Sequence, residues 1–597
     1  MKLKNVLIFY FILGSSNILS DDYIINTSSG ITFGYEKNGT ISWDDIPYAK
    51  PPINDLRWRA PQDLDSSSIN KIIKPKEDNF CVQEPSGLGG SEGDEYFSGT
   101  EDCLYLDIKA PLVNNSQKLL PVMFWIHGGG NTSGLKDLYD FSTMIKNHDV
   151  LVVTINYRLG PFGWFTHPSI QGLQTGLDKT SNFGTLDIIA ALTWVKKNIS
   201  NFGGDPNNVT IFGESAGGHN VLSLLVSVQA RGLFHKAISQ SGYTTTYSLE
   251  DSYRPSKLSS TSEHSSWNVV NKIIEDRSLK VSQKDNEKEI RNLLKSLSAK
   301  ELFKFYAGRP SYENLPLLTA DDIVIPKIGL TEALSKKEYV YNVPVIAGSN
   351  RDEVKLWLAS AKYFVDLDYS FFGSIFQVPK VVLNDKSAFN LFNLYRSKAW
   401  KIRGVDGPLR SLYEAGNNNL YAYRYDWDDH RRFIIADFKE LIGAAHATEI
   451  PLLTGNNKLV GDYGFLIYPR GPSKKFTSKN MMLFWTNFAK NSEPGSSTNG
   501  VEWKKYNGLK NASSNYMILD KRKALKMQSD NFSFSSLIHD LYKEEDLSKL
   551  ERCVVLLQML TYVGNDLYGQ YADEYPGNCN RIESEQFLKD NASFIDY

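Results

Sequence analysis

Short apolar runs alternate with amphipathic stretches over about residues 120–240. The runs 121–126, 150–155 and 209–212 are apolar and rich in branched residues, as is typical of buried strands. Between the last two runs, residues 186–199 carry apolar positions at helical spacing. Because strands that alternate with helices form βαβ units, the pattern predicts the α/β class, with a mostly parallel sheet flanked by helices.

The pattern changes over about residues 245–315, where Ser, Lys, Glu and Asn predominate among scattered apolar positions. This stretch predicts an insertion of helices or loops over the sheet. A further buried strand is predicted at 343–347 and a helix at 480–489. The chain has no internal repeat and no long linker rich in Pro or Gly, so we expect residues 21–597 to form a single domain.

The first twenty residues differ from the rest. Two lysines precede an apolar run at 6–13, and small residues follow, which is the pattern of a signal peptide. The run is shorter than the roughly 20 residues that cross a bilayer. We therefore expect residues 1–20 to be removed near Ser16 or Ser20, leaving a secreted or periplasmic protein without a membrane anchor. The alternative is an uncleaved N-terminal anchor.

Composition and charge narrow the possible partners. The chain is 41% hydrophobic, which is enough apolar material for a packed core. Its 66 basic and 68 acidic residues give a net charge of -2, and so supply no cationic field for a polyanion. Nucleic acid is therefore not an expected partner.

The four cysteines should pair if the chain is exported to an oxidising compartment. Several connectivities are possible, and joining Cys81 to Cys103 and Cys553 to Cys579 closes the shortest loops. We predict these two disulfides. The sequence has no cluster of His and Cys at the spacing of metal ligands, so no metal site is expected.

Two segments fit the pattern Gly-x-Ser-x-Gly, one around Ser91 and one around Ser215. A nucleophile elbow needs a strand before the serine and a helix after it, because the sharp turn lifts the hydroxyl above the sheet edge. The run 209–212 supplies the strand before Ser215, and 220–226 supplies an apolar helix after it. Ser91 has neither. The context predicts Ser215 as a nucleophile and Ser91 as an exposed loop residue.

A run of three glycines at 128–130 follows His127 and a predicted strand. Glycines let a backbone approach a substrate closely and aim its N–H groups at it. The N–H groups of Gly129, Gly130 and Ala216 would form an oxyanion hole, in which each donor lowers the barrier by roughly 3 kcal/mol. The alternative is an ordinary glycine turn.

The general base should lie downstream of the nucleophile, because the chain order behind such an elbow is nucleophile, acid, histidine. Three of the histidines qualify. His430 stands in a charged run and is interpreted as solvated surface, and His539 lies in the C-terminal tail. His446 stands among small residues, as suits an imidazole that must approach another loop. We predict His446 as the base.

The acid should follow a buried strand and precede the histidine. Asp352 and Glu353 come shortly after the predicted strand at 343–347. Composition does not choose between them, and both could equally be surface carboxylates.

Several further segments share motifs with one known family. They are Thr100–Leu106, Trp125–Gly130, Asn156–Gly160, Asn182–Asp187, Phe202–Thr210, the elbow at 213–217, Gln240–Gly242 and Trp485–Ala489. Through these segments the chain resembles, over nearly its whole length, the type-B carboxylesterases, which include cholinesterases and some lipases. The resemblance implies an α/β-hydrolase fold with helical or loop insertions over the active site.

The resemblance also implies roles for single residues. In that family the acid is the Glu of an Asp-Glu pair at this point, which favours Glu353. The resemblance implies the Cys81–Cys103 bridge as well, closing a loop at the rim of the active-site gorge. That loop has no Trp, the residue with which cholinesterases hold choline, so choline esters are not expected as substrates. Asn131 stands where many relatives have an aromatic residue, a difference that could alter the acyl side of the pocket.

The expected function is hydrolysis of small carboxylic esters by a secreted serine hydrolase, as a monomer or homodimer and without a cofactor. His446 would take the proton of Ser215, the serine would attack the ester carbonyl, and water would later release the acyl group. One alternative is a noncatalytic adhesion or recognition protein of the same fold. The other is a lipase or amidase, which residues 245–315 do not distinguish.

Overall fold

The computed structural model describes most of the chain. The described residues are 23–76, 79–87, 96–112, 118–254, 265–283, 286–308, 315, 317–368, 380–433, 436–461, 464–508, 514–577, 579 and 590–594. The predicted signal peptide and Ser91 lie outside these residues.

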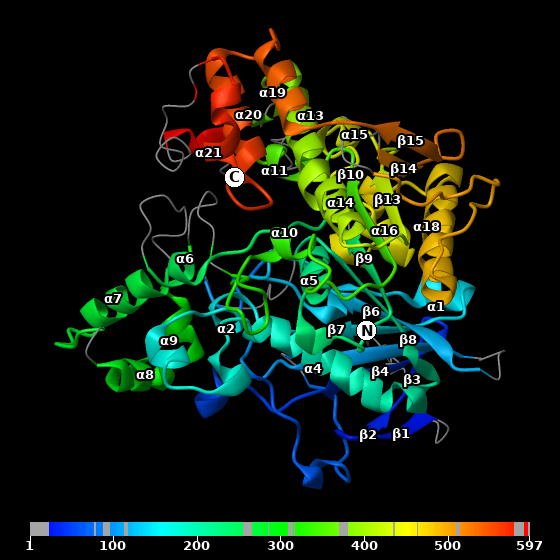
Figure 1. The fold of residues 1–597 in the computed structure, drawn as a ribbon. Helices are drawn as coiled ribbons and strands as arrows, with labels where there is room; N and C mark the ends of the chain where they lie inside the picture. The colour runs from blue at the N-terminus through cyan, green and yellow to red at the C-terminus, as the bar shows by residue number, and fades with distance from the viewer. Residues whose placement is uncertain are drawn as a thin grey trace, which may run out of the picture.

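An eleven-stranded sheet forms the centre of the molecule (Figure 1). Its parallel part runs, in spatial order, through β14 (Ser514–Leu519), β13 (Leu420–Tyr425), β10 (Val345–Asn350), β9 (Lys236–Gln240), β8 (Gly204–Glu214), β6 (Leu120–Ile126) and β7 (Leu151–Ile155). Antiparallel strands continue the sheet on both sides, namely β15 (Lys526–Asp530) beyond β14, and β5 (Tyr105–Pro111), β4 (Thr40–Pro47) and β3 (Tyr35–Lys37) beyond β7. The predicted α/β class is confirmed.

The predicted strands correspond to β6, β7, β8 and β10. The largest difference is in β8, which begins at Gly204 instead of residue 209. Residues 205–208 of β8 are Asp, Pro, Asn and Asn and are at least partly exposed, and the pairing with β6 is irregular between Leu120 and Val122. They carry no apolar pattern that sequence could recognise as a strand.

Apolar side chains on the central strands alternate between two cores, one on each face of the sheet. In β6, Val122, Phe124 and Ile126 pack on one face, whereas Met123 and Trp125 pack on the other. Helices α4 (Phe183–Asn198), α5 (Ala216–Leu224) and α14 (Gly407–Glu414) contribute to the first core. Helices α1 (Ser142–Asn147), α16 (Ile450–Thr454) and α18 (Pro472–Asn491) contribute to the second.

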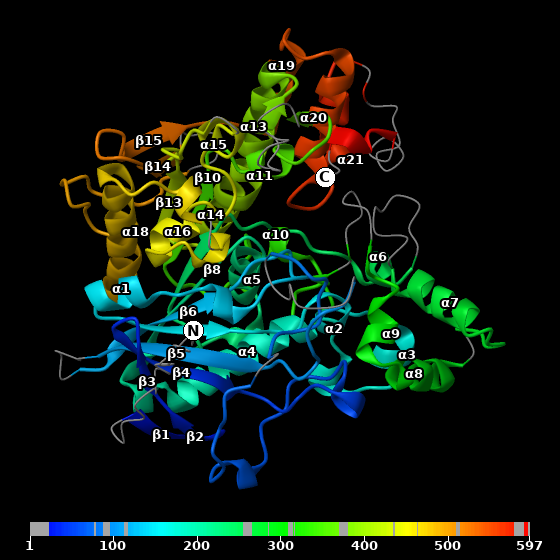
Figure 2. The same cartoon turned by 180° about the vertical axis from the view of Figure 1, so that it is seen from behind.

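Two groups of helices lie outside these layers. The predicted insertion is helical in its described part, with α6 (Leu249–Tyr253), α7 (Ser266–Asp276), α8 (Glu287–Ser296) and α9 (Ala299–Phe303). Helices α7 to α9 share an apolar cluster and extend to one side of the sheet (Figures 1 and 2). The C-terminal helices α19 (Phe534–Tyr542) and α20 (Lys549–Thr561) pack with α13 (Lys386–Lys401) around another cluster, at the top of both views.

Two disulfides link the cysteines. Cys81 is bonded to Cys103, and Cys553 is bonded to Cys579. Among the described residues, no helix combines the length and the apolar character that a membrane crossing requires.

Candidate active site

Ser215 occupies the sharp turn between β8 and α5, with φ 58° and ψ −121°. A non-glycine residue in such a conformation is strained by about 1–3 kcal/mol. The flanking glycines are required by space, since a Cβ on Gly213 would lie 2.6 Å from the Ile126 carbonyl oxygen and one on Gly217 would collide with the same oxygen. The Ser215 N–H donates to the Gln240 carbonyl at 2.8 Å. Local sequence therefore forces the serine into a strained, well-held turn.

The predicted oxyanion donors leave the sheet beside this elbow. Ile126 and Gly213 are register partners at the carboxyl ends of β6 and β8, so the loops that follow start next to each other. A Cβ on Gly128 would come within 3.1 Å of the Ser215 Cβ, which shows how closely the glycine loop approaches the serine. No described residue accepts a hydrogen bond from the N–H of Gly129, Gly130 or Ala216. These three donors remain available to an external acceptor.

His446 contacts Glu353 and not Asp352. The imidazole Nδ1 lies 2.7 Å from Glu353 Oε2, and the His446 N–H donates to the Glu353 carbonyl at 3.1 Å. Glu353 is fully buried, and its other carboxylate oxygen accepts the N–H of Asn350 at 2.7 Å. The carboxylate is thereby oriented from one side by backbone and holds the imidazole on the other.

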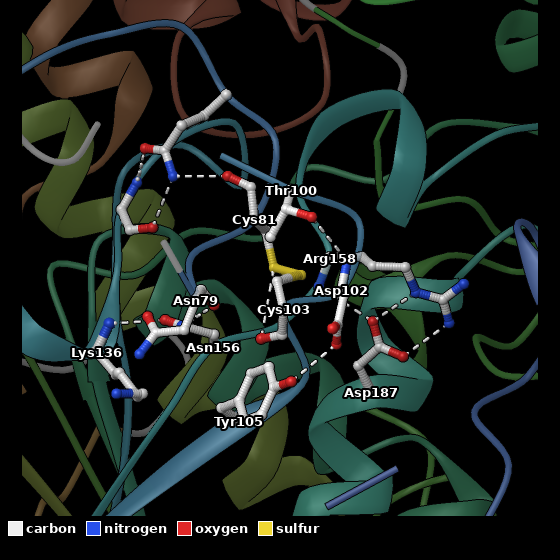
Figure 3. The surroundings of a disulfide bond; sticks show 12 residues. Asn79, Cys81, Thr100, Asp102, Cys103, Tyr105, Lys136, Asn156, Arg158 and Asp187 are labelled. Atoms are coloured by element: carbon white, nitrogen blue, oxygen red, sulfur yellow. Dashed lines mark hydrogen bonds and ion pairs between the residues drawn. A yellow bond between two sulfur atoms is a disulfide. The ribbon is translucent and has the colours of Figure 1, made fainter. Parts of the chain in front are cut away.

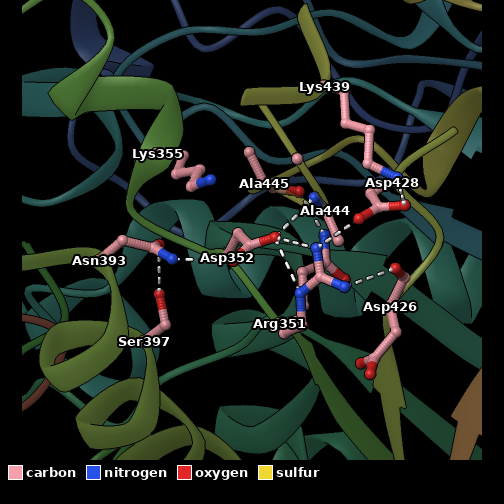
Figure 4. Close-up of polar contacts among 12 residues, drawn as sticks. Arg351, Asp352, Lys355, Asn393, Ser397, Asp426, Asp428, Lys439, Ala444 and Ala445 are labelled. Atoms are coloured by element: carbon pink, nitrogen blue, oxygen red, sulfur yellow. Dashed lines mark hydrogen bonds and ion pairs between the residues drawn. The ribbon is translucent and has the colours of Figure 1, made fainter. Parts of the chain in front are cut away.

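Asp352 is directed to different partners (Figure 4). Its Oδ2 accepts from Arg351 Nη2 at 2.6 Å and from the Ala444 N–H at 3.0 Å, and its Oδ1 accepts from Asn393 Nδ2 at 2.8 Å. Burial would raise the pKa of Asp352, but the paired Arg351 guanidinium outweighs burial and lowers it. Asp352 thus fastens the loop that carries His446 without touching the imidazole.

Glu214 is a site residue that the sequence analysis missed. Its Oε1 lies 3.1 Å from His446 Nε2, on the side of the ring opposite Glu353, and both side chains are buried. Among the described residues, Nε2 has no hydrogen-bond partner. A signal was present, because a carboxylate occupied the variable position of the elbow pentapeptide inside an otherwise buried run.

The electrostatics of this group follow from its burial. Burial lowers the pKa of His446, but the Glu214 charge and the hydrogen bond with Glu353 outweigh it and raise the pKa to about 9. Burial raises the pKa of Glu214 to about 8. Burial also raises the pKa of Glu449, whose carboxylate accepts from Asn350 Nδ2 at 2.7 Å. Protons are therefore held by the imidazole and these carboxyl groups as one coupled system.

His430 corrects an interpretation made from sequence. It is only 5% exposed, and its Nε2 lies 2.8 Å from the carbonyl oxygen of Gly443, three residues before His446. The neighbouring carboxylates of Asp428 and Asp429 are paired with Lys439 and Lys521. Burial lowers the pKa of His430 to about 4, so the ring is neutral and supports the loop of His446.

Asn131 directly follows the three glycines. It has a φ of 59° and is fully buried, and its Oδ1 accepts from Asn220 Nδ2 in α5 at 2.8 Å. Asn tolerates this left-handed conformation better than most residues. Its side chain braces the glycine loop against α5.

Two tryptophans flank the histidine. The ring centroids of Trp357 and Trp400 lie 5.0 Å and 4.8 Å from that of His446. Because these residues are far from His446 in the sequence, no local pattern identifies them as neighbours of the imidazole.

Known proteins are similar to this chain in sequence. The model of the Carboxylesterase family matches residues 21–382 and 402–535. The chain is 32% identical over 500 residues to para-nitrobenzyl esterase of Bacillus subtilis (strain 168), covering 81% of this chain and 92% of that protein. It is 33% identical over 481 residues to carboxylesterase 1E of Rattus norvegicus, covering 75% and 81%.

Solved structures agree with the sequence comparisons. A PNB esterase structure superposes with a TM-score of 0.65 at 27% identity, covering 85% of this chain and 97% of that one. A carboxylesterase of Geobacillus stearothermophilus superposes with a TM-score of 0.62 at 26% identity, covering 85% and 98%.

Proposed function

This chain belongs to the carboxylesterase family and is a carboxylic ester hydrolase, and we propose that it works through a triad of Ser215, His446 and Glu353. The observation that carries the proposal is the arrangement around His446. The imidazole is held by Glu353 through Nδ1, and its Nε2 faces the elbow residue Glu214, next to the serine. A buried carboxylate that holds Nδ1 and leaves Nε2 without a hydrogen bond among the described residues supports the role of His446 as general base.

Catalysis proceeds in two acyl transfers. His446 Nε2 takes the proton of the Ser215 hydroxyl as the oxygen attacks the ester carbonyl, and the imidazolium then protonates the departing alcohol. Water gives a proton to the same nitrogen as it attacks the acyl carbonyl. The imidazolium then protonates Ser215 Oγ as the acyl–oxygen bond breaks, which releases the carboxylic acid and the free serine. Glu353 stabilises the imidazolium in both steps.

The glycine loop and α5 stabilise the charge that develops on the carbonyl oxygen. Gly129, Gly130 and Ala216 offer N–H groups without acceptors among the described residues. Each donor aligned with the oxyanion lowers the barrier by roughly 3 kcal/mol. The proposed substrates are small-molecule esters, in line with the names of the related esterases.

A covalent probe tests the site directly. A fluorophosphonate probe should label the wild-type protein on Ser215, identified by peptide mapping, and Ser215→Ala and His446→Ala should fold but lose nearly all turnover of aryl esters. Near-normal turnover by either variant, or an adduct on another residue, would refute the triad. Rates over aryl esters of graded acyl length would separate an esterase from a lipase, and a protein that neither reacts nor turns over would be a noncatalytic relative.

We further propose that residues 1–20 are a signal peptide, that residues 21–597 form one domain, and that the mature protein is secreted or periplasmic. The two disulfides support export, because such bonds persist in oxidising compartments. N-terminal sequencing of the mature protein tests this, and a retained Met1 would contradict it.

A further inference from the structure

Several residues of the glycine loop have backbone conformations that favour glycine. Gly129, Gly130, Asn131 and Gly134 all have positive φ, at 94°, 65°, 59° and 115°. Within the loop, the Gly129 carbonyl accepts the N–H groups of the residues at positions 132 and 133, which tightens the turn. Glycine loses more conformational entropy on ordering than any other residue, so a glycine-rich turn needs support from outside.

Gln83 supplies such support at the end of the loop. Its Oε1 accepts the Gly134 N–H at 2.9 Å, while its Nε2 donates to the Gly134 carbonyl at 3.1 Å and to the Cys81 carbonyl at 3.0 Å. The side chain is fully buried. Every hydrogen of the amide is used, and the two-bond pairing with Gly134 fixes both the position and the orientation of that residue.

Gly134 passes this constraint to the start of the loop. A Cβ on Gly134 would lie 2.5 Å from His127 Nδ1 and 2.8 Å from the Gly128 carbonyl oxygen, so the loop closes on itself at this point. Gly128 immediately precedes the donor Gly129. A displacement of Gly134 would therefore shift the Gly128 peptide and, with it, the N–H groups of Gly129 and Gly130.

The segment that carries Gln83 is cross-linked by the Cys81–Cys103 disulfide, whose surroundings are shown in Figure 3. The Gln83 backbone pairs with Ser98 in both directions, at 3.0 Å and 2.9 Å, and the Cys81–Cys103 bond lies two residues away. Asn79, in the same segment, accepts from Asn156 Nδ2 at 3.1 Å through its carbonyl. The amide of Gln83 thus extends from a cross-linked, hydrogen-bonded segment.

We propose that Gln83 is a positioning residue of the esterase reaction, which sets the oxyanion donors of the glycine loop through its paired hydrogen bonds to Gly134. The inference rests on the proposed function, because it assigns the donors their place in that mechanism. It also implies that the Cys81–Cys103 segment contributes to catalysis, although this segment lies far from the triad residues in the sequence.

Gln83→Met tests the inference, because it keeps the length of the side chain and removes all three hydrogen bonds. A misplacement of about 1 Å costs about 10²-fold in rate, so kcat for an aryl ester should fall about 10- to 100-fold while KM changes less than about threefold. The rate of reaction with the fluorophosphonate probe should fall in parallel, since its phosphoryl oxygen uses the same donors. The same probe also counts the reactive serines in each preparation, so that kcat can be calculated per active enzyme molecule.

Gln83→Glu gives a second readout that a merely structural role would not move. A protonated carboxyl keeps an acceptor and one donor for Gly134, whereas an ionised one faces the carbonyl oxygens of Gly134 and Cys81. The kcat of this variant relative to wild type should therefore rise as the pH is lowered. This measurement decides the matter if Gln83→Met does not fold.

Gln174→Met is the matched control. Gln174 is buried and donates to the carbonyls of Trp58 and Asp178, away from the glycine loop. It should lose stability and keep its kcat. If the Gln83 variants lose only stability, as this control does, the inference is overturned. If wild type itself has no esterase activity, or the probe labels a residue other than Ser215, the proposed function fails instead.

Discussion

Replacing Glu214 by Gln should move the acidic limb of the pH–rate profile to lower pH. The general base works only as neutral imidazole, so kcat/KM falls as the pH drops below the pKa of the group that includes His446. A negative charge at Glu214, 3.1 Å from Nε2, favours the imidazolium and raises that pKa. Gln has the shape of Glu without its charge, so the substitution removes this contribution alone.

The size of the shift can be bounded from the structure. Two unit charges 3.1 Å apart interact by about 5 kcal/mol at an effective dielectric constant of about 20. This is an upper bound, because burial raises the pKa of Glu214 to about 8 and keeps it partly protonated near neutral pH. A carboxylate at this range typically shifts a neighbour by about 1–3 pKa units. We expect the midpoint of the acidic limb to move to lower pH by about 1–2 pH units, equivalent to about 1.4–2.8 kcal/mol.

The test measures kcat/KM for one aryl ester with wild type and with Glu214→Gln. The pH runs from 5 to 10, which is about the range over which these groups titrate. The pH at the midpoint of the acidic limb is the quantity compared, and the maximum value of kcat/KM is not. Glu551→Gln is the control, since Glu551 is also buried but bonds to Tyr363 and the start of α20, and its limb should match wild type. A Glu214→Gln limb that stays in place, or moves to higher pH, would refute the electrostatic reasoning.

Two further predictions concern the acid and the first disulfide. Glu353→Gln should fold normally and lose about 10³- to 10⁴-fold in kcat. Asp352→Asn should keep most of its kcat and lose about 1–3 kcal/mol of unfolding free energy. Steady-state kinetics and urea unfolding of both variants measure these effects, and the opposite result would exchange the roles of the two carboxylates. Replacing Cys81 and Cys103 together by Ser opens a loop with a sequence separation of 22 and should lower the unfolding free energy by about 3 kcal/mol; an unchanged urea midpoint would contradict this estimate.

The surroundings of Ser215 were predictable from sequence because they depend on short-range patterns. The strand, the glycines and the helix are consecutive, and the conformation of the turn is decided within five residues. The order of nucleophile, acid and histidine along the chain likewise restricted the predicted base to a few histidines. The acid was not decided by residue type, because Asp352 and Glu353 are adjacent and differ in direction, which only the fold determines.

Residues that act through long-range contacts were missed or misinterpreted. The charges beside His430 suggested solvent, yet its two neighbouring aspartates pair with lysines from other segments and the ring is buried. Glu449 and Gln83 carry no motif that marks them, and their importance comes from hydrogen bonds to Asn350 and Gly134. A one-dimensional pattern reports burial and periodicity but does not report which segments meet.

The three parts of the site are held in different ways, and this difference should govern the effect of substitutions. Ser215 is fixed by its own strained turn, so changes to the flanking glycines cause collisions with the backbone and should impair folding. The imidazole of His446 is fixed from a distance by Glu353, and its loop is fixed by Asp352. The glycine loop depends in the same way on contacts from outside it. Since those contacts lie away from the elbow, their loss should leave a folded protein whose reacting groups are misaligned, and so reduce kcat before it reduces the yield of folded enzyme.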